Sequence, residues 1–238
     1  MSSFWNISKL EFEMSIRRKG PWLAYGIMFA FYLLAIILGG RFQENPSMSL
    51  AKMWDLNALL AFMFNLFPPV VAGISTADRL IRDRALHTDE LLRSSPLPMR
   101  NYLIGKYLGV LAASAAPALV FILALRVYAI VIGAPAVTFG MTVTTFLAVN
   151  LPAYVFVTAF SLICPLVMPT RVFQVLFTGY WFWGNFVYPE MFPSLSGTVL
   201  QASGKVPAEG IFNIHSPFGQ IGITGGAQSQ NCLIDLVF

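Results

Sequence analysis

Charged residues are scarce in this chain of 238 amino acids: Asp, Glu, Lys and Arg make up 11% of it, and hydrophobic residues make up 57%. Soluble domains carry about 25% charged residues. An ordinary water-soluble protein is therefore excluded, and the composition predicts an integral membrane protein. Cysteine and histidine occur twice each. The topology that the loops predict separates Cys164 from Cys232 across the membrane, so no disulfide is expected between them.

A phosphate-binding loop is also lacking. The sequence contains Gly105-Lys106 and Gly204-Lys205, but neither pair has the glycine five residues earlier that the loop requires. The chain is therefore not expected to be its own ATPase. If ATP drives it, a separate nucleotide-binding subunit must hydrolyse the ATP.

Long apolar runs, by contrast, are abundant. A helix needs about 20 mostly apolar residues to cross a bilayer. Five runs meet or approach this length, at residues 22–40, 56–74, 107–125, 143–167 and 172–192. They lack the two-residue alternation of barrel strands, so we predict an all-α integral membrane protein with one transmembrane domain over residues 21–238. A further apolar run begins at residue 232 and stops at 238, which favours a truncated sixth span.

The segment 1–20 precedes the first predicted span. Its apolar residues recur at helical spacing among charged ones: Phe4, Ile7, Leu10 and Met14. This pattern predicts a short amphipathic helix on the inner membrane surface. A solvated tail is the alternative.

The basic residues predict the orientation. Eleven of the 15 Lys and Arg residues lie before the first run or in the loops that follow the second and fourth runs. Because basic residues resist translocation, these segments and the amino terminus are expected to be cytoplasmic. The cytoplasmic coupling loop then covers 76–104, and an extracytoplasmic loop covers 193–231.

Two predicted spans contain polar and helix-breaking residues. Asn65 precedes Pro68-Pro69 in the second span, and Asn150 precedes Pro152 in the fourth. We expect kinks there that expose backbone carbonyls, serving either helix packing or a polar translocation surface. The aromatic block of the fifth span is either an interfacial belt or an apolar substrate surface. The candidate pathway residues are Asn65, Asn150, Trp181 and Trp183.

Two features belong to the third span. Arg126 is expected near the outer headgroups as a snorkelling side chain rather than as an intramembrane functional charge. Gly105, Gly109 and Ala113 recur every fourth residue and predict close approach by another helix.

A charge-dense island lies between the second and third spans. Residues 83–98 (DRALHTDELLRSSPLP) and 102–108 (YLIGKYL) resemble the cytoplasmic loop of membrane subunits of type-two ATP-binding cassette exporters. The matching positions are Asp83, Thr88, Glu90, Leu91, Leu92, Pro96, Gly105 and Lys106. The sequence departs from the family pattern at Asp83, where glutamate is usual, at His87, where glycine is frequent, and at Asp89, where an apolar residue is expected.

The resemblance implies partners and a bacterial-type inner membrane as the location. A cytoplasmic ATPase subunit carrying ATP and Mg²⁺ would dock beneath residues 78–98, and a second membrane subunit, identical or different, would complete the pathway. No cofactor or metal is expected on this chain, and lipids but no nucleic acid are expected to contact it. The implied coupling residues are Asp83, Leu86, Thr88, Glu90, Leu91, Leu92 and Arg93. The loop chemistry agrees, because apolar anchors among charges can seat in a groove of a partner; a solvated loop is the alternative.

Two other classes of protein remain as alternatives. A membrane enzyme could use the acidic residues of the island together with His87, but the interleaved arginines would repel a metal cation. His87 and His215 are predicted on opposite sides of the membrane, which excludes a two-histidine metal site within one chain. A secondary transporter would place an ion relay inside its spans. In the predicted spans the sole acidic residue is Glu190, near an outer end, which favours energy delivered by a partner.

Overall fold

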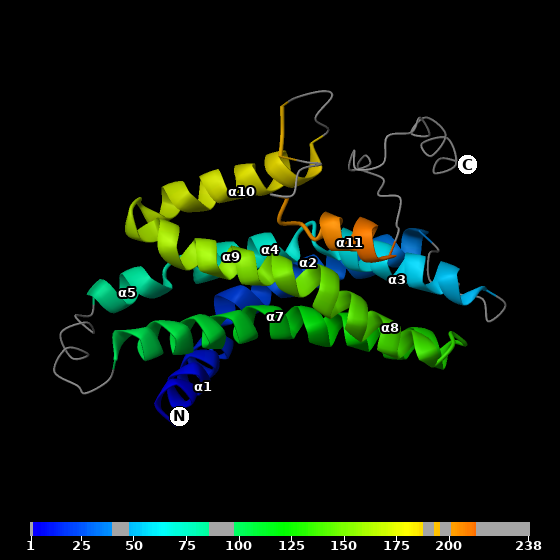
Figure 1. Ribbon diagram of the computed structural model, residues 1–238, viewed down its shortest axis with the longest axis horizontal. Coiled ribbons are helices and arrows are strands. Elements are labelled where there is room, and N and C mark those ends of the chain that lie inside the picture. Colours follow the sequence, from blue (N-terminus) through cyan, green and yellow to red (C-terminus); the bar gives the residue numbers. More distant parts are fainter. Residues whose placement is uncertain (1, 40–47, 86–97, 188–192, 196–200, 213–238) are drawn as a thin grey trace.

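The computed structural model describes residues 2–39, 48–85, 98–187, 193–195 and 201–212 (Figure 1). Within them every regular element is helical, which confirms the predicted all-α fold. The helices, in chain order, are α1 (Ser2–Ile16), α2 (Lys19–Gly39), α3 (Leu50–Phe64), α4 (Pro68–Thr76), α5 (Arg79–Ala85), α7 (Met99–Val131), α8 (Val137–Thr145), the π-helical turn η1 (Phe146–Asn150), α9 (Leu151–Ile163), the 3-10 turn η2 (Cys164–Leu166), α10 (Thr170–Phe186) and α11 (Lys205–Phe212).

Among the residues that the structure describes, four helical stretches are long and apolar enough to cross a membrane: Lys19–Leu38, Leu50–Asp83, Met99–Val131 and Val137–Leu166. They largely contain the first four predicted runs. The fifth run overlaps α10, which has 17 residues and rises about 26 Å at about 1.5 Å per residue. Residues 188–192 of that run lie outside the described part of the chain.

The predicted kinks are confirmed, and proline accounts for their positions. Helix α3 ends at Phe64, and α4 restarts at Pro68 after a short turn. Pro152 lies in the first turn of α9, directly after η1. Proline is tolerated there because the first turn of a helix does not use its N–H groups, whereas inside a helix it removes a hydrogen bond.

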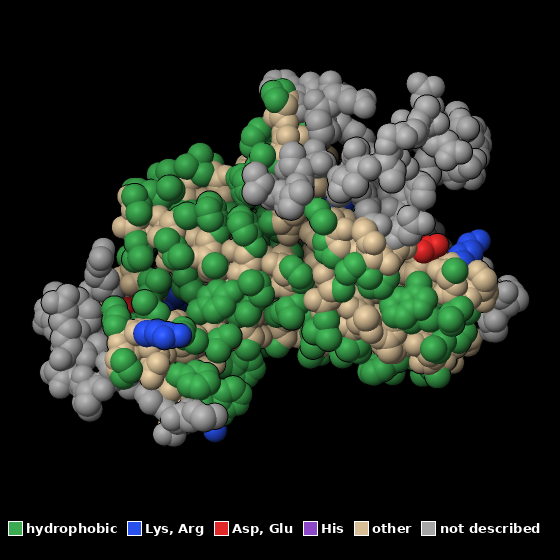
Figure 2. Space-filling model, in the orientation of Figure 1, with side chains coloured by type: hydrophobic (Ala, Val, Ile, Leu, Met, Phe, Trp, Pro, Cys, Tyr) green, Lys and Arg blue, Asp and Glu red, His purple; other side chains and the backbone are tan. Residues whose placement is uncertain are grey.

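The helices run mainly along the long axis of the molecule (Figure 1). Helices α8 and α9 lie along α7, and α4 packs on α9. The core between α3, α4, α9 and α10 holds large buried aromatic side chains, including Phe62, Tyr154, Phe177 and Trp181. On the face drawn in Figure 2, apolar side chains cover the middle, and the charged ones gather toward the two ends of the long axis. This distribution fits helices that cross a bilayer along the long axis.

Helix α1 packs closely against the first half of α7. A Cβ atom added at Gly105 would lie 2.7 Å from the carbonyl oxygen of Phe4, and one at Gly109 would lie 2.5 Å from that of Ser8. The close approach predicted at the small residues is therefore confirmed, and the helix that approaches is the amino-terminal one. The apolar side chains Trp5, Leu10 and Met14 of α1 remain exposed, as expected for a helix that also touches lipid.

We expect Gly109→Ala to loosen α1 from α7, because the added methyl group would overlap the Ser8 carbonyl. Overpacking of this kind costs about 1–3 kcal/mol. Hydrogen exchange of the α1 amides measures the effect. The control is Gly140→Ala on α8, where an added Cβ meets no atom within 4 Å. Equal α1 protection in the two variants would contradict this packing.

Candidate functional site

A network of ion pairs joins α1, α5 and α7 at one end of the bundle. Lys106 Nζ on α7 lies 2.6 Å from Glu11 Oε1 on α1 and 2.5 Å from Asp83 Oδ2 on α5. Arg79 Nη1 lies 3.8 Å from Glu11 Oε2. The hydroxyl of Tyr102 donates a hydrogen bond to Asp83. We call Glu11, Arg79, Asp83, Tyr102 and Lys106 the charged junction.

The charged junction is mostly buried within the protein. Lys106 is 2% exposed, and Glu11 and Arg79 are each 6% exposed. A buried charge is tolerated when it is paired, and removal of one partner from such a pair is strongly destabilising. The junction therefore fixes the position of α5 relative to α1 and α7.

A second, more exposed ion pair also connects the amino-terminal segment with the residues around α5. Arg18, between α1 and α2, donates from Nη1 to both carboxylate oxygens of Asp78, at 2.9 and 3.1 Å. Its partner Asp78 immediately precedes α5. The amino-terminal segment is thus tied at two places to the beginning of the predicted coupling loop.

The structure places one of the predicted coupling residues. Asp83 points into the charged junction, with 26% of its side chain exposed. The others, Leu86, Thr88, Glu90, Leu91, Leu92 and Arg93, lie outside the described residues. Sequence reasoning did not identify Glu11 and Lys106 as the partners of this loop. The available signal was Gly105, which precedes Lys106 in the Gly-Lys motif and belongs to the row of small residues on α7 that predicts close approach by another helix.

The candidate pathway residues Asn65 and Asn150 contact each other inside the bundle. Asn150 Nδ2 donates to Asn65 Oδ1 at 2.7 Å and to the Ala61 carbonyl of α3 at 2.8 Å. Asn65 Nδ2 donates to the Val149 carbonyl of η1 at 3.0 Å. Each amide thus binds the backbone of the other interrupted helix, and Asn65, Asn150 and these two carbonyls are here called the asparagine hinge.

The hinge carries one unmet acceptor. Asn150 Oδ1 is buried and has no hydrogen-bond partner among the described residues. Leaving a buried acceptor unpaired costs about 1–3 kcal/mol. π-helical turns such as η1 often occur at functional sites, so this part of the bundle is a candidate for movement.

The segment 201–204, which lies far from Asn65 in the sequence, contacts the asparagine hinge. Asn65 Nδ2 donates to the Ser203 carbonyl at 2.7 Å, and Gln201, Ser203 and Lys205 are buried. Gly204 has φ +81° and packs directly against Val149. The sequence predicted a polar extracytoplasmic loop over 193–231 and gave no indication of this packing.

Gly204→Ala should destabilise the protein, because the added Cβ would overlap the Val149 carbonyl oxygen and the positive φ disfavours a side chain. Overlap and strain together are expected to cost about 2–4 kcal/mol. The midpoint of thermal unfolding measures the change. Gly210→Ala is the matched control, because a Cβ there meets no atom within 4 Å. A midpoint equal to that of the control would contradict the packing of this segment.

The two tryptophans among the pathway candidates lie in different surroundings. Trp181 is fully buried, and its Nε1 donates to the Leu66 carbonyl at 3.2 Å, in the turn between α3 and α4. Trp183 is 42% exposed. Asn65, Asn150 and Trp181 therefore all satisfy carbonyls near the helix interruptions, and Trp183 stands apart from them.

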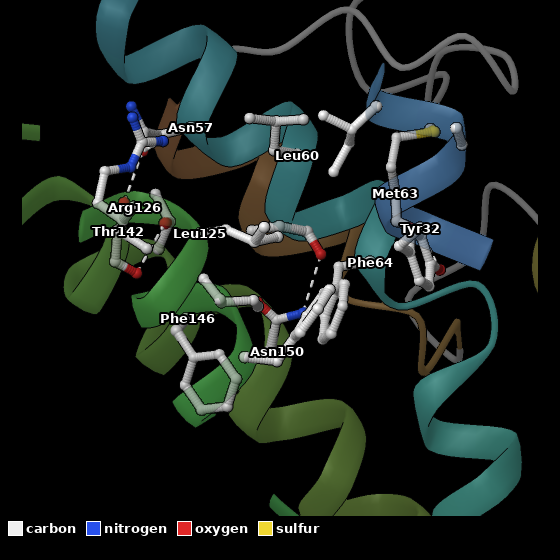
Figure 3. A pocket seen from close by; sticks show the side chains of 16 residues that line it. Tyr32, Asn57, Leu60, Met63, Phe64, Leu125, Arg126, Thr142, Phe146 and Asn150 are labelled. Atoms are coloured by element: carbon white, nitrogen blue, oxygen red, sulfur yellow. Dashed lines mark hydrogen bonds between the residues drawn. The ribbon is translucent and has the colours of Figure 1, made fainter. Parts of the chain in front are cut away.

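A cavity of about 350 Å³ lies between α2, α3, α7 and the α8–η1 segment (Figure 3). Arg126, which is 4% exposed, donates to Asn57 Oδ1 at 2.6 Å, and Thr142 Oγ1 donates to the same oxygen at 2.9 Å. The expectation that Arg126 snorkels is therefore wrong, because its side chain is buried and hydrogen-bonded inside the bundle; its position near the outer headgroups stays a prediction. Its hydrogen-bond partner Asn57 belongs to α3, and Thr142 of α8 binds the same oxygen. The position of Arg126 along α7 does not predict that these two helices lie beside it.

The fold and these sites define a helical membrane protein with several spans, a charged junction at one end and polar groups at its helix interruptions. Residues 5–215 match the family described as ABC-2 family transporter protein, so the chain belongs to this family. No curated protein and no solved structure gave a match. The chain is the membrane subunit of an ABC transporter, located in the membrane as a transport subunit rather than an enzyme. The resemblance read from the charged island is confirmed.

Proposed function

We propose that the chain forms the substrate pathway of an ATP-driven exporter, and that a separate cytoplasmic subunit hydrolyses the ATP. Membership of the family supports this proposal, and so does the lack of a phosphate-binding loop in the sequence. ATP and Mg²⁺ would be held by the ATPase subunit. The observation that carries the proposal is the buried Lys106, which joins the start of the predicted docking loop to two other helices.

In this proposal the ATPase docks beneath residues 78–98 and pushes on α5 during its cycle. The ion pair between Lys106 and Asp83 would pass that force to α7, and the one between Lys106 and Glu11 would pass it to α1. Docking residues beyond α5 would be Leu86, Thr88, Glu90, Leu91, Leu92 and Arg93. A rigid, buried connection suits this role because it moves as one body rather than bending.

The asparagine hinge would then allow the spans to change shape. Both of its helices are interrupted at the contact, and the unmet Asn150 Oδ1 would gain a donor in an alternative arrangement. A two-state element of this kind is what an ATP-driven change between inward- and outward-open states requires. Asn65, Asn150 and Trp181 are proposed to border the moving part of the pathway.

The same proposal places the amino terminus and the charged junction in the cytoplasm of a bacterial-type cell. The support is the concentration of Lys and Arg in the segments at that end, because such residues resist translocation. A second membrane subunit, identical or different, would complete the pathway in the inner membrane.

The test is extraction of the full-length protein in a mild detergent, followed by mass spectrometry and an ATPase assay of what co-purifies. We expect a soluble ATPase in stoichiometric amount. The double variant Glu90→Ala, Arg93→Ala should insert normally and lose the coupling of ATP hydrolysis to transport, whereas Lys9→Ala, on the exposed face of α1, should retain it. Recovery of the wild-type chain without an ATPase, or unchanged coupling in the double variant, would count against the proposal.

A further inference from the structure

A second cavity, of about 320 Å³, lies beside the charged junction, where α1, α5 and the beginning of α7 meet (Figure 1). Its volume falls within the range of small-molecule sites, which is about 300–1,000 Å³. Cationic side chains make up most of its described lining: Arg17, Arg18, Arg79, Arg82 and Lys106. The carboxylates of Glu11 and Asp83 and the side chain of Met14 complete that lining. We call it the arginine cavity.

The arginine cavity carries an excess of positive charge. Both of its carboxylates are paired with Lys106, Glu11 at 2.6 Å and Asp83 at 2.5 Å. Arg18 is paired with Asp78, which does not line the cavity. The charges of the remaining arginines are not offset by these pairs. A cleft lined by charges of one sign attracts counter-ions, so the cavity favours an anionic ligand.

Two of the arginines have donors to offer such a ligand. Arg17 and Arg82 are exposed, and neither forms an ion pair or a side-chain hydrogen bond within the part of the chain that the structure describes. Arg79 is buried, and its Nη1 lies 3.8 Å from Glu11 Oε2, which is too long for a hydrogen bond. Its charge is therefore only partly balanced and adds to the positive field.

A pair of unengaged guanidinium groups at one cavity suits a phosphate group. Each guanidinium can give two parallel N–H bonds to two oxygens of a phosphate. A phosphate has enough oxygens to bind both groups at once, whereas a carboxylate has only two. Arg17 directly follows α1 and Arg82 belongs to α5, so one phosphate would connect these two segments.

The apolar surface next to the cavity points to a membrane lipid as the source of the phosphate. Met14 lines the cavity, and Leu10 lies one turn earlier on the same face of α1; both are exposed. Trp22 is exposed as well, and its Nε1 donates to the Ile16 carbonyl at the end of α1. Exposed apolar side chains and tryptophan are typical of helices in the headgroup region. A soluble phosphate compound would gain nothing from them.

We propose that the arginine cavity binds the phosphate of an anionic phospholipid, whose acyl chains leave it over Met14 and Leu10. Basic pockets between membrane helices bind phospholipid head groups in this way. Binding requires neither the ATPase nor transport, so it can fail or succeed independently of the proposed exporter function. A lipid held by Arg17 and Arg82 would strengthen the connection between the amino-terminal segment and α5, the helix on which the ATPase is proposed to push.

The test uses the full-length protein in a maltoside detergent without any ATPase, and native mass spectrometry counts the lipids that stay bound. The probe is dioleoyl phosphatidic acid. Dioleoylglycerol carries the same chains without the phosphate, and glycerol 3-phosphate carries the phosphate without the chains. We expect one phosphatidic acid site per chain, with affinity about tenfold or more above that of dioleoylglycerol, because each basic residue near an anionic lipid contributes about fivefold. Glycerol 3-phosphate at equal concentration should not displace the lipid.

A double variant tests the residues of the cavity. Arg17→Gln combined with Arg82→Gln changes two exposed side chains outside the charged junction, so it should fold normally and lose about tenfold or more in affinity for phosphatidic acid. The matched control is Lys9→Gln combined with Arg100→Gln. It removes the same charge from exposed positions on α1 and at the beginning of α7 that do not line the cavity, and it should bind the lipid like the wild type.

Equal binding of phosphatidic acid and dioleoylglycerol to the wild type would overturn the proposal, because the phosphate would then add nothing. Displacement of the lipid by an equal concentration of glycerol 3-phosphate would overturn the lipid as the source and indicate a soluble phosphate ligand. An equal loss of affinity in the double variant and in its control would show that net charge, rather than this cavity, attracts the lipid.

Discussion

Replacing Lys106 by methionine should be among the most damaging single changes in the described part of the chain. Methionine has a similar length but leaves the buried carboxylate of Glu11 and the half-buried carboxylate of Asp83 without their shared cation. Removing one partner from a buried pair costs about 3–5 kcal/mol. We expect a much lower unfolding midpoint in nanodiscs and, where the ATPase is bound, loss of coupling.

Lys9→Met is the matched control, because it removes the same charge from an exposed position of α1. A fourfold variant sharpens the test: Lys106→Met combined with Arg79→Met, Glu11→Leu and Asp83→Leu replaces all four charges of the junction by apolar side chains. Replacing a complete set of buried ion pairs by apolar residues is often close to neutral for stability, so the fourfold variant should regain much of the stability lost in Lys106→Met. If Lys106→Met is as stable as Lys9→Met, the charged junction does not hold these helices together.

Asn65→Leu is expected to have the second large effect. The leucine would leave the carbonyls of Val149 and Ser203 without their donor and would take away the acceptor used by Asn150. Each buried group left unpaired costs about 1–3 kcal/mol. The loss of several such bonds should lower the unfolding midpoint strongly and increase proteolysis of the segment 201–212.

The control for the hinge is Asn101→Leu, the same substitution at a half-buried position at the beginning of α7. It should have little effect on either measurement. A stable Asn65→Leu variant with an intact 201–212 segment would show that the hydrogen bonds of the hinge contribute little. The two readouts distinguish a local loss of docking from general unfolding.

The sequence predicted the features that depend on neighbouring residues. The helix interruptions follow from Pro68 and Pro152, whose rings and missing N–H groups act within one turn. The close helix contact at Gly105 and Gly109 follows from a four-residue repeat on a single helix face. These local patterns can be recognised without knowing which helix is the partner, and for the same reason they do not identify that helix.

The features that the sequence did not predict depend on residues far apart in the chain. Glu11 and Lys106 are 95 positions apart, and Asn65 and Ser203 are 138 apart. The distance of Arg126 from the start of its helix predicts how deep it lies in the membrane, but it does not predict which helices surround it. Asp83 was predicted to face a partner protein, and its contacts within the chain became apparent only when α1 and α7 were placed beside it.

The pairing of Glu11 with Lys106 has a consequence for the order of biosynthesis. A ribosome adds about 5–20 residues per second, so α1 must wait on the order of 5–20 s before the residue that neutralises its carboxylate has been made. Until then a buried position for Glu11 is unfavourable, because an unpaired charge is costly away from water. Helix α1 therefore docks only after the first half of α7 has been made, and insertion of the third span completes this end of the bundle.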